Sequence, residues 1–229
     1  MKRPALDTVH LVTRSVPGGW DRLCAHVEAC LAAGIRIVQF RDKEAPDREK
    51  VRRVRELLEL ARRHAAIVLV NDRLDVALAA GADGVHLGAD DLPWEAARRL
   101  APPPFVLGCT AATPERIARA KAAGADYVGA GPAAPSRTKP DTGPRLDGPA
   151  YAALARAAAG PPRPIPLIAV GGITAREVPA LVERGVAGVA VSAAVLLAED
   201  PGDAAARLVR TLETARRGAA GEGSPPGLT

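Results

Sequence analysis

Four segments of the chain share one pattern of apolar and polar positions. Each segment ends a helix-like stretch with a glycine and continues into a short, apolar, β-branched run. A glycine just past a helix end adopts the left-handed conformation that other residues resist. An apolar run without alternation is typical of a parallel strand that is covered on both faces. The pattern therefore predicts joints between repeated βα units, in segments 32–40, 79–87, 122–130 and 183–191, with glycines at Gly34, Gly81, Gly124 and Gly185.

Apolar runs of this kind recur along the whole chain, and a helical stretch follows each one. They predict eight strands, at residues 9–13, 35–40, 66–70, 83–87, 105–108, 126–130, 166–170 and 188–192. Eight βα units in 229 residues fit a single-domain α/β fold, the (β/α)8 or TIM barrel. A doubly wound open sheet is the alternative, but it more often carries a G-x-G-x-x-G turn after its first strand, where this chain has VTRSVPGG.

The ends of the chain differ from the barrel in composition. Residues 218–229 are rich in Gly, Ser and Pro, so we expect a barrel domain over residues 1–217 and a disordered tail after it. The first residues lack the apolar core of a signal peptide, and no apolar run is long enough to cross a bilayer. The three cysteines have no metal-like spacing. We expect a cytoplasmic protein with no membrane partner.

The charge of the chain bears on its ligands. The net charge is +5, and much of the basic charge lies in residues 48–64, with glutamates interleaved at helical spacing. That pattern is typical of a solvated helix face, and only 3% of the residues are aromatic, which argues against a base-stacking platform for nucleic acid. Small phosphorylated substrates also attract positive charge, and we expect these rather than nucleic acid.

Polar residues and glycines follow the predicted strand ends, where (β/α)8 barrels carry their active sites. Singly, each has a structural explanation, because Asn and Asp commonly cap helices and glycines form turns. Together they place cations, carboxylates and a glycine turn around one barrel mouth, which favours function. The residues are Gln39, Arg41, Lys43, Asn71, Asp72, Asp90, Asp91, Thr110, the loop SRTKPD at 136–141, Gly171, Gly172, Ser192 and Ala193.

Such a mouth suits a multiply charged phosphate compound. Asp72 and Asp91, on neighbouring loops, suit a hard divalent ion that bridges phosphate oxygens. Arg41, Lys43 and Lys139 would neutralise the remaining charge. A second anion site, without metal, is predicted from the backbone N–H groups of Gly172, Ser192 and Ala193.

The strings GIRIVQFRDKE, NDRLDVALAAGADGVHLGADD, GADYVGAGP, SRTKPDTG and IAVGGIT, in this order, strongly resemble the thiamine phosphate synthase family. The resemblance runs from about residue 8 to residue 210, and its motifs are specific as a set. It implies a Mg²⁺-dependent barrel enzyme with two small-molecule substrates. The thiazole nitrogen of a thiazole phosphate attacks a hydroxymethylpyrimidine diphosphate, which loses pyrophosphate.

The resemblance also implies a role for each matching residue. Asp72 and Asp91 would hold Mg²⁺, and Arg41 and Lys139 would act in catalysis by stabilising the departing pyrophosphate. The pyrimidine diphosphate would contact Gln39, Arg41, Lys43, Asn71, Thr110 and Lys139. The thiazole phosphate would contact Ser136, Arg137, Thr138, Gly172, Ser192 and Ala193.

Some positions depart from the family pattern. Ala112 stands where the family usually has histidine, Ala133 and Ala134 replace bulky residues, and Ala193 stands where serine is frequent. Two alternatives therefore stay open: a thiazole tautomerase-like paralogue, whose histidine would fall at position 112, and a non-catalytic barrel that binds a phosphate ligand. His86, inside the fourth strand, is expected to be a satisfied core residue. The sequence also leaves open whether the chain forms a homo-oligomer.

Overall fold

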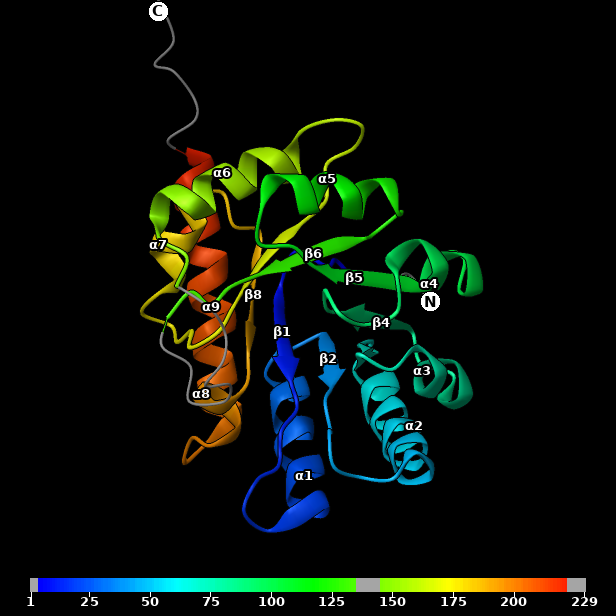
Figure 1. Ribbon diagram of the computed structural model, residues 1–229. Coiled ribbons are helices and arrows are strands. Elements are labelled where there is room, and N and C mark those ends of the chain that lie inside the picture. The colour runs from blue at the N-terminus through cyan, green and yellow to red at the C-terminus, as the bar shows by residue number, and fades with distance from the viewer. Residues whose placement is uncertain (1–3, 135–144, 222–229) are drawn as a thin grey trace, which may run out of the picture.

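The computed structural model describes residues 4–134 and 145–221, with side chains up to residue 219. Over these residues, parallel strands close into one barrel in the order β1 to β8, and β8 pairs with β1. The helices form an outer layer around the strands (Figure 1). The strands are β1 (Val9–Val12), β2 (Ile37–Phe40), β3 (Ile67–Asn71), β4 (Gly84–Leu87), β5 (Val106–Thr110), β6 (Tyr127–Ala130), β7 (Leu167–Val170) and β8 (Gly188–Val191).

The predicted TIM barrel is confirmed, and each predicted strand is present with its ends shifted by at most two residues. The helices are α1 (Gly19–Ala32), α2 (Asp47–Arg63), α3 (Leu74–Ala80), α4 (Trp94–Leu100), α5 (Pro114–Ala122), α6 (Gly148–Ala159), α7 (Val178–Val182), α8 (Ala193–Leu196) and α9 (Pro201–Gly221). The α9 helix continues four residues past the expected domain boundary at 217, and the rest of the expected tail lies outside the described residues. Within the described part of the chain, no helix is both long and apolar enough to cross a membrane.

The helix-to-strand joints have the expected conformation. Gly34, Gly81, Gly124 and Gly185 all have left-handed backbones, with φ between 74° and 106°. In two joints the aspartate that follows binds the preceding strand. The Asp83 carboxylate accepts the Val68 N–H at 2.8 Å, and the Asp126 carboxylate accepts the Leu107 N–H at 2.9 Å. The repeated Gly-Ala-Asp sequence thus both reverses the chain and satisfies an amide at the start of the neighbouring strand.

Successive residues along each strand enter two different cores. Outward residues such as Leu11, Val38 and Val85 pack against the helices in the larger hydrophobic cluster. Inward residues form a smaller cluster in the barrel bore, which includes Ile37 and Ile168. Below the carboxyl ends of the strands the bore is filled with side chains, as in other barrels of the class. The space for a ligand therefore lies at the carboxyl ends of the strands.

Candidate active site

A cavity of about 540 Å³ opens at the carboxyl ends of the strands. Its wall includes these residues that the sequence indicated: Gln39, Arg41, Asn71, Asp72, Thr110, Gly172, Ser192 and Ala193. Lys43 is exposed on the loop after β2, and neither it nor Asp91 belongs to the described wall. The predicted residues Ser136, Arg137, Thr138 and Lys139 lie outside the described residues.

The first polar layer of the cavity comes from β2 and β3. Gln39 is buried, and its Nε2 donates to Asn71 Oδ1 at 2.6 Å. This bond occupies the Asn71 oxygen and fixes the orientation of its amide, so the Asn71 N–H groups are the ones left for a ligand. The side chain of Asn71 therefore does not cap α3, whose N-cap position is held by Arg73 without a side-chain hydrogen bond.

Asp72 lies in a strained turn directly after β3. Its φ is 68°, in the left-handed region that a non-glycine residue rarely adopts. Two backbone bonds hold this conformation: Asp72 N–H donates to His86 O, and Arg73 N–H donates to Asn71 O, both at 2.8 Å. The second bond spans only three residues, as in a γ-turn of the strained kind. Strain of this type persists where the surroundings over-determine it and is frequent at functional sites.

Asp91 lies on the loop after β4, next to β3 in the barrel. Its Oδ2 accepts the Gly88 N–H at 2.6 Å, so the loop folds back on itself, and Gly88 in turn lines the cavity. Among the described residues, no group of three or more His, Cys, Asp or Glu side chains could hold a metal ion. The two loops each supply one carboxylate, Asp72 in the cavity wall and Asp91 beside Gly88. Such a pair fits Mg²⁺, which usually takes one or two protein carboxylates and completes its shell with water and phosphate oxygens.

Two buried polar atoms in the cavity wall have no hydrogen-bond partner among the described residues. They are Arg41 Nε and Ser192 Oγ. Buried polar atoms are nearly always paired, so an orphan in a cavity wall indicates a ligand. The Arg41 backbone is held firmly, because its N–H donates to Thr13 Oγ1 at 2.8 Å while that hydroxyl donates back to Arg41 O at 3.3 Å.

The β7 and β8 ends supply a glycine turn beside Ser192. Gly171 and Gly172 follow β7 with φ values of 98° and 65°. A Cβ on Gly171 would lie 2.9 Å from Pro132 Cα, so no larger residue fits there. Thr174 stabilises the turn, since its N–H and hydroxyl both donate to Glu177 Oε2, at 2.8 and 2.6 Å. The result is a rigid, side-chain-free backbone after strand seven, where barrels of this class often bind phosphate.

Sequence reasoning missed part of the cavity floor. His86 and Tyr127 both line the cavity, and His86 Nδ1 lies 2.9 Å from the Tyr127 hydroxyl. His86 Nε2 lies 3.0 Å from Thr110 Oγ1, so the imidazole is satisfied, as expected, but it is half-buried at the cavity rather than enclosed in the core. Gly108 makes room for this floor, because a Cβ there would overlap the Tyr127 ring.

A period-two count from the strand ends would have found these residues. His86 precedes the cavity residue Gly88 by two positions, and Tyr127 precedes Gly129 by two. Residues two apart on a strand share a face, so both side chains point into the bore. Burial raises the pKa of Tyr127, which keeps its hydroxyl protonated as a hydrogen-bond partner.

Comparisons with known proteins agree on one family. A family model described as thiamine monophosphate synthase matches residues 9–195. The thiamine-phosphate synthase of Anaeromyxobacter dehalogenans is 45% identical over 201 residues, which cover 88% of this chain and 87% of that protein. A solved structure, thiamine phosphate pyrophosphorylase from Pyrococcus furiosus, superposes with a TM-score of 0.78 at 31% identity and covers 91% of this chain and 96% of its own.

Other matches differ in length or show the fold alone. The bifunctional protein ThiM/ThiE of Symbiobacterium thermophilum is 44% identical over 190 residues, which cover 83% of this chain but 38% of that protein. The match to the Synechocystis thiamine-phosphate synthase, at 41% identity, covers 84% of this chain and 54% of the relative. The chain thus spans about two fifths to half of these longer relatives. A 3-hexulose-6-phosphate synthase, with a TM-score of 0.66 at 18% identity, shares the barrel.

Proposed function

Because the chain belongs to the thiamine monophosphate synthase family, we propose that it joins a hydroxymethylpyrimidine diphosphate to a thiazole phosphate and releases pyrophosphate. The thiazole nitrogen donates its lone pair to the methylene carbon, and the new C–N bond gives thiamine phosphate. The C–O bond to the diphosphate breaks, and its electron pair leaves with pyrophosphate. No proton has to be removed from the nucleophile, so the reaction needs positioning and charge stabilisation rather than a general base.

The proposal rests above all on the two orphan atoms of the cavity wall. Arg41 Nε and Ser192 Oγ are buried polar groups with no partner among the described side chains and backbone. Arg41, at the end of β2, suits the departing diphosphate, because its planar guanidinium can bind two phosphate oxygens. Ser192, with the neighbouring backbone at Gly172 and Ala193, suits the phosphate of the thiazole substrate. Two separate anion sites in one cavity match two phosphorylated substrates.

The pyrimidine ring would then occupy the floor between these anion sites. The Asn71 amide, oriented by Gln39, offers donors to a ring nitrogen. The half-buried His86 imidazole, held against the buried Tyr127 ring with centroids 5.4 Å apart, offers an aromatic ligand a ring to pack against. Thr110 completes this floor through its bond to His86.

Mg²⁺ is part of this proposal. Asp72 and Asp91 would hold the ion, which when bound would neutralise negative charge on the diphosphate oxygens. The strained backbone at Asp72 supports a carboxylate held in place for this task. Lys139, outside the described residues, remains our candidate for a further cation on the diphosphate.

The tautomerase alternative has less support. It requires an acid or base in the loop after β5, where Ala112 stands. His86 is the imidazole nearest in chain order, but both of its ring nitrogens already have partners in Tyr127 and Thr110. Only a measurement of turnover would exclude a barrel that binds a phosphate ligand without catalysis.

The decisive experiment measures pyrophosphate release and thiamine phosphate formation by the purified protein with both substrates and Mg²⁺. We expect the two products in equal amounts, and neither when one substrate is omitted or EDTA is added. Binding of both substrates without product would mean a non-catalytic barrel. Conversion of the thiazole phosphate alone to an isomer would mean a tautomerase.

A further inference from the structure

Tyr127 lies at the floor of the cavity, and its surroundings hold its hydroxyl in one position. The residue is 1% exposed. Its ring packs against the His86 ring and meets the His10 ring edge-on, with centroids 5.4 and 5.1 Å away. Gly108 closes the space around the hydroxyl, because a Cβ there would overlap the Tyr127 oxygen. The hydroxyl is therefore fixed where it reaches His86.

The hydrogen of this hydroxyl decides which nitrogen of His86 is protonated. Among the described residues, the hydrogen-bond partner of the Tyr127 hydroxyl is His86 Nδ1, at 2.9 Å. Burial raises the pKa of Tyr127, so the hydrogen stays on its oxygen. A buried O–H hydrogen without an acceptor costs free energy, so Tyr127 donates and Nδ1 accepts. An accepting Nδ1 carries no proton, and the proton of the imidazole is then on Nε2.

The Nε2 proton in turn sets the direction of the Thr110 hydroxyl. Nε2 lies 3.0 Å from Thr110 Oγ1, so Nε2 donates and the threonine oxygen accepts. Within the described part of the chain, His86 is the one hydrogen-bond partner of this hydroxyl. Thr110 is half-buried and lines the cavity. Its own hydrogen is therefore offered to the cavity.

The cavity floor thus presents two donors on either side of β4. Asn71 ends β3 and offers its amide N–H groups, while Thr110 ends β5 and offers its O–H. Strands two apart in a sheet lie about 10 Å from each other. A six-membered ring with a hydrogen bond at each of two nitrogens spans a similar distance. A pyrimidine has two such nitrogens, and both accept.

We propose that Tyr127 is a positioning residue for the pyrimidine substrate. Acting through His86, it directs the Thr110 hydrogen into the cavity, so the site selects a ring nitrogen that accepts a hydrogen bond. A ring N–H in the same place would meet the Thr110 hydrogen and bind more weakly. The identity of the ring rests on the proposed function, whereas the direction of the hydrogen-bond chain does not.

The protonated nitrogen of His86 gives a direct test in the substrate-free protein. The four histidine rings are labelled with a nitrogen isotope, and NMR spectroscopy at mildly alkaline pH distinguishes protonated from unprotonated ring nitrogens. The signals that disappear in His86→Gln belong to His86. We expect a proton on Nε2 and none on Nδ1. A proton on Nδ1 would overturn the proposal, because Tyr127 could then not donate to it.

Tyr127→Phe removes the hydroxyl at the start of this chain. Nδ1 then loses the Tyr127 donor, so the Thr110 hydrogen can turn to His86 instead of the cavity. Binding of the pyrimidine diphosphate is measured by calorimetric titration with Mg²⁺ and without the thiazole phosphate. We expect the Kd to rise about three- to tenfold, the effect of one lost hydrogen bond.

Tyr151→Phe is the matched control. Tyr151 is also buried, and its hydroxyl donates to Ala130 O at 3.0 Å, on the same strand as Tyr127. Tyr151 does not belong to the described cavity wall. Its replacement should lower stability by a similar amount and leave the Kd unchanged. Equal Kd values for the two variants would mean that Tyr127 serves the fold alone.

Two pyridine analogues of the substrate, each with C–H in place of one ring nitrogen, identify the atom that Thr110 contacts. One of them should bind the wild type about three- to tenfold more weakly, and Thr110→Val should cost that analogue nothing further. Thr110→Ser keeps the hydroxyl and should behave as the wild type. A further loss of equal size for both analogues in Thr110→Val would overturn the assigned contact.

The outcomes separate this inference from the proposed function. A protein that shows the Nε2 proton and Thr110-dependent binding but never releases pyrophosphate would refute the proposed function alone. Turnover by a protein with the proton on Nδ1 would refute the role of Tyr127 alone. Failure to bind the pyrimidine diphosphate would refute both.

Discussion

At the scale of single residues, Asp72 and its neighbour Arg73 show how a charged surface can support a strained site. Arg73 binds both oxygens of Asp47, at 2.8 and 2.7 Å, and both oxygens of Asp75, at 2.9 and 2.6 Å. These hydrogen bonds lower the pKa values of both carboxyls. The three side chains are 37%, 60% and 66% exposed, so the pairs contribute little to global stability. Their local effect is to hold the residue that follows the left-handed Asp72.

Arg73→Ala should therefore weaken metal binding more than it weakens folding. Without the fork, the turn can relax from its strained conformation, which stores about 1–3 kcal/mol. We expect about a tenfold higher Mg²⁺ concentration for half-maximal activity, and a similar loss of Mn²⁺ affinity in substrate-free protein, followed by electron paramagnetic resonance. Arg48→Ala removes an exposed arginine beside Asp47 and serves as the control. Equal metal affinity in both variants would show that the ion pairs of Arg73 have no effect on the metal site.

Ser192 offers a second test at this scale. Its buried Oγ has no partner among the described residues, so folding gains nothing from it. Ser192→Ala should raise KM for the thiazole phosphate about tenfold, leave KM for the pyrimidine diphosphate unchanged, and not lower stability. Steady-state kinetics with each substrate varied in turn, together with urea denaturation, distinguishes a substrate-binding role of the hydroxyl from a structural one. A loss of stability with unchanged KM values would mean that the hydroxyl is structural.

At the scale of helices, charged side chains from one element complete the ends of another. Lys121 is a buried residue of α5, yet its Nζ donates to Ala157 O at 2.6 Å and Gly160 O at 2.7 Å, at the end of α6. A third contact reaches Pro161 O at 3.4 Å. The last carbonyls of a helix have no partner within it, so this ammonium acts as a cap supplied by a neighbour.

Lys121→Met keeps the length and apolar stem of the side chain but removes all three donors. Because partly buried carbonyls at the end of α6 are left without this donor, we expect a loss of about 1–3 kcal/mol in the free energy of unfolding. Urea denaturation followed by circular dichroism measures it. Arg116→Met, at an exposed position of the same helix, should change stability by less than about 0.5 kcal/mol. Similar midpoints for the two variants would contradict the capping role.

The same scale shows what the sequence could and could not reveal. A glycine after a helix marked four of the strands, and apolar runs located the others; both are local signals. Local sequence does not indicate which residues of a strand face inward. In a parallel barrel both faces of each strand are buried. His86 and Tyr127 therefore lie in segments whose sequence predicts core strands and does not distinguish the two faces. Their place in the cavity depends on strand register and closure, which link residues far apart in the chain.

For the candidate site, strand-end position was the stronger guide. Gln39, Asn71 and Ser192 were found because parallel strands all end at the same rim, whatever the details of packing. A second cavity, of about 190 Å³, was missed, since Arg53 lines it from the middle of α2 and Trp20 from α1, and no motif joins these residues in the sequence. The loop with Lys139 stays a prediction.

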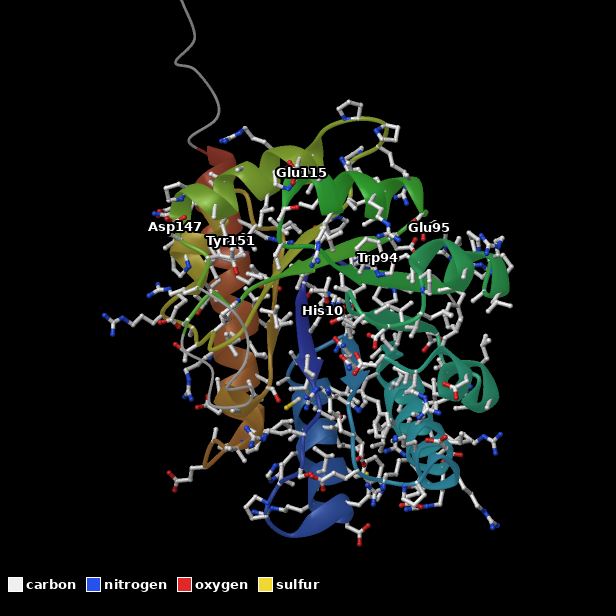
Figure 2. All side chains as sticks on the ribbon, viewed as in Figure 1. His10, Trp94, Glu95, Glu115, Asp147 and Tyr151 are labelled. Carbon is white, nitrogen blue, oxygen red and sulfur yellow. The ribbon has the colours of Figure 1, made fainter. Side chains whose placement is uncertain are left out.

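At the scale of the whole molecule, the barrel separates function from stability. The cavity lies at the carboxyl ends of the strands, and the bore beneath it is closed by apolar residues and by His10, which lies within the ring of strands (Figure 2). Arg216 of α9 joins the first and last parts of the chain, because it donates to the carbonyls of Asp7 and Ala187, next to β1 and β8. This contact helps to close the barrel into one unit, which encloses His10.

His10 makes the stability of this unit depend on pH. Its ring is 1% exposed, its edge meets the Tyr127 ring, and its Nε2 lies 2.7 Å from Leu6 O. A carbonyl only accepts, so Nε2 carries a proton and donates. Burial lowers the pKa of His10 from 6.5 to about 4, although the Leu6 carbonyl and the Asp7 carboxylate partly offset this effect. The folded protein thus keeps His10 neutral at pH values where the unfolded chain protonates it.

The sign of the effect follows from proton binding. Between pH 6.5 and about 4 the unfolded state binds a proton that the folded state refuses, so acid stabilises the unfolded chain. The free energy of unfolding should fall by about 2 kcal/mol from pH 7 to pH 5 on account of this residue, given about 1.4 kcal/mol per pH unit. His10→Gln cannot titrate and should flatten the slope over this interval, whatever its own cost in stability. Urea denaturation at half-unit pH steps measures both proteins, and parallel curves for wild type and His10→Gln would show that His10 is not the group whose protonation destabilises the fold.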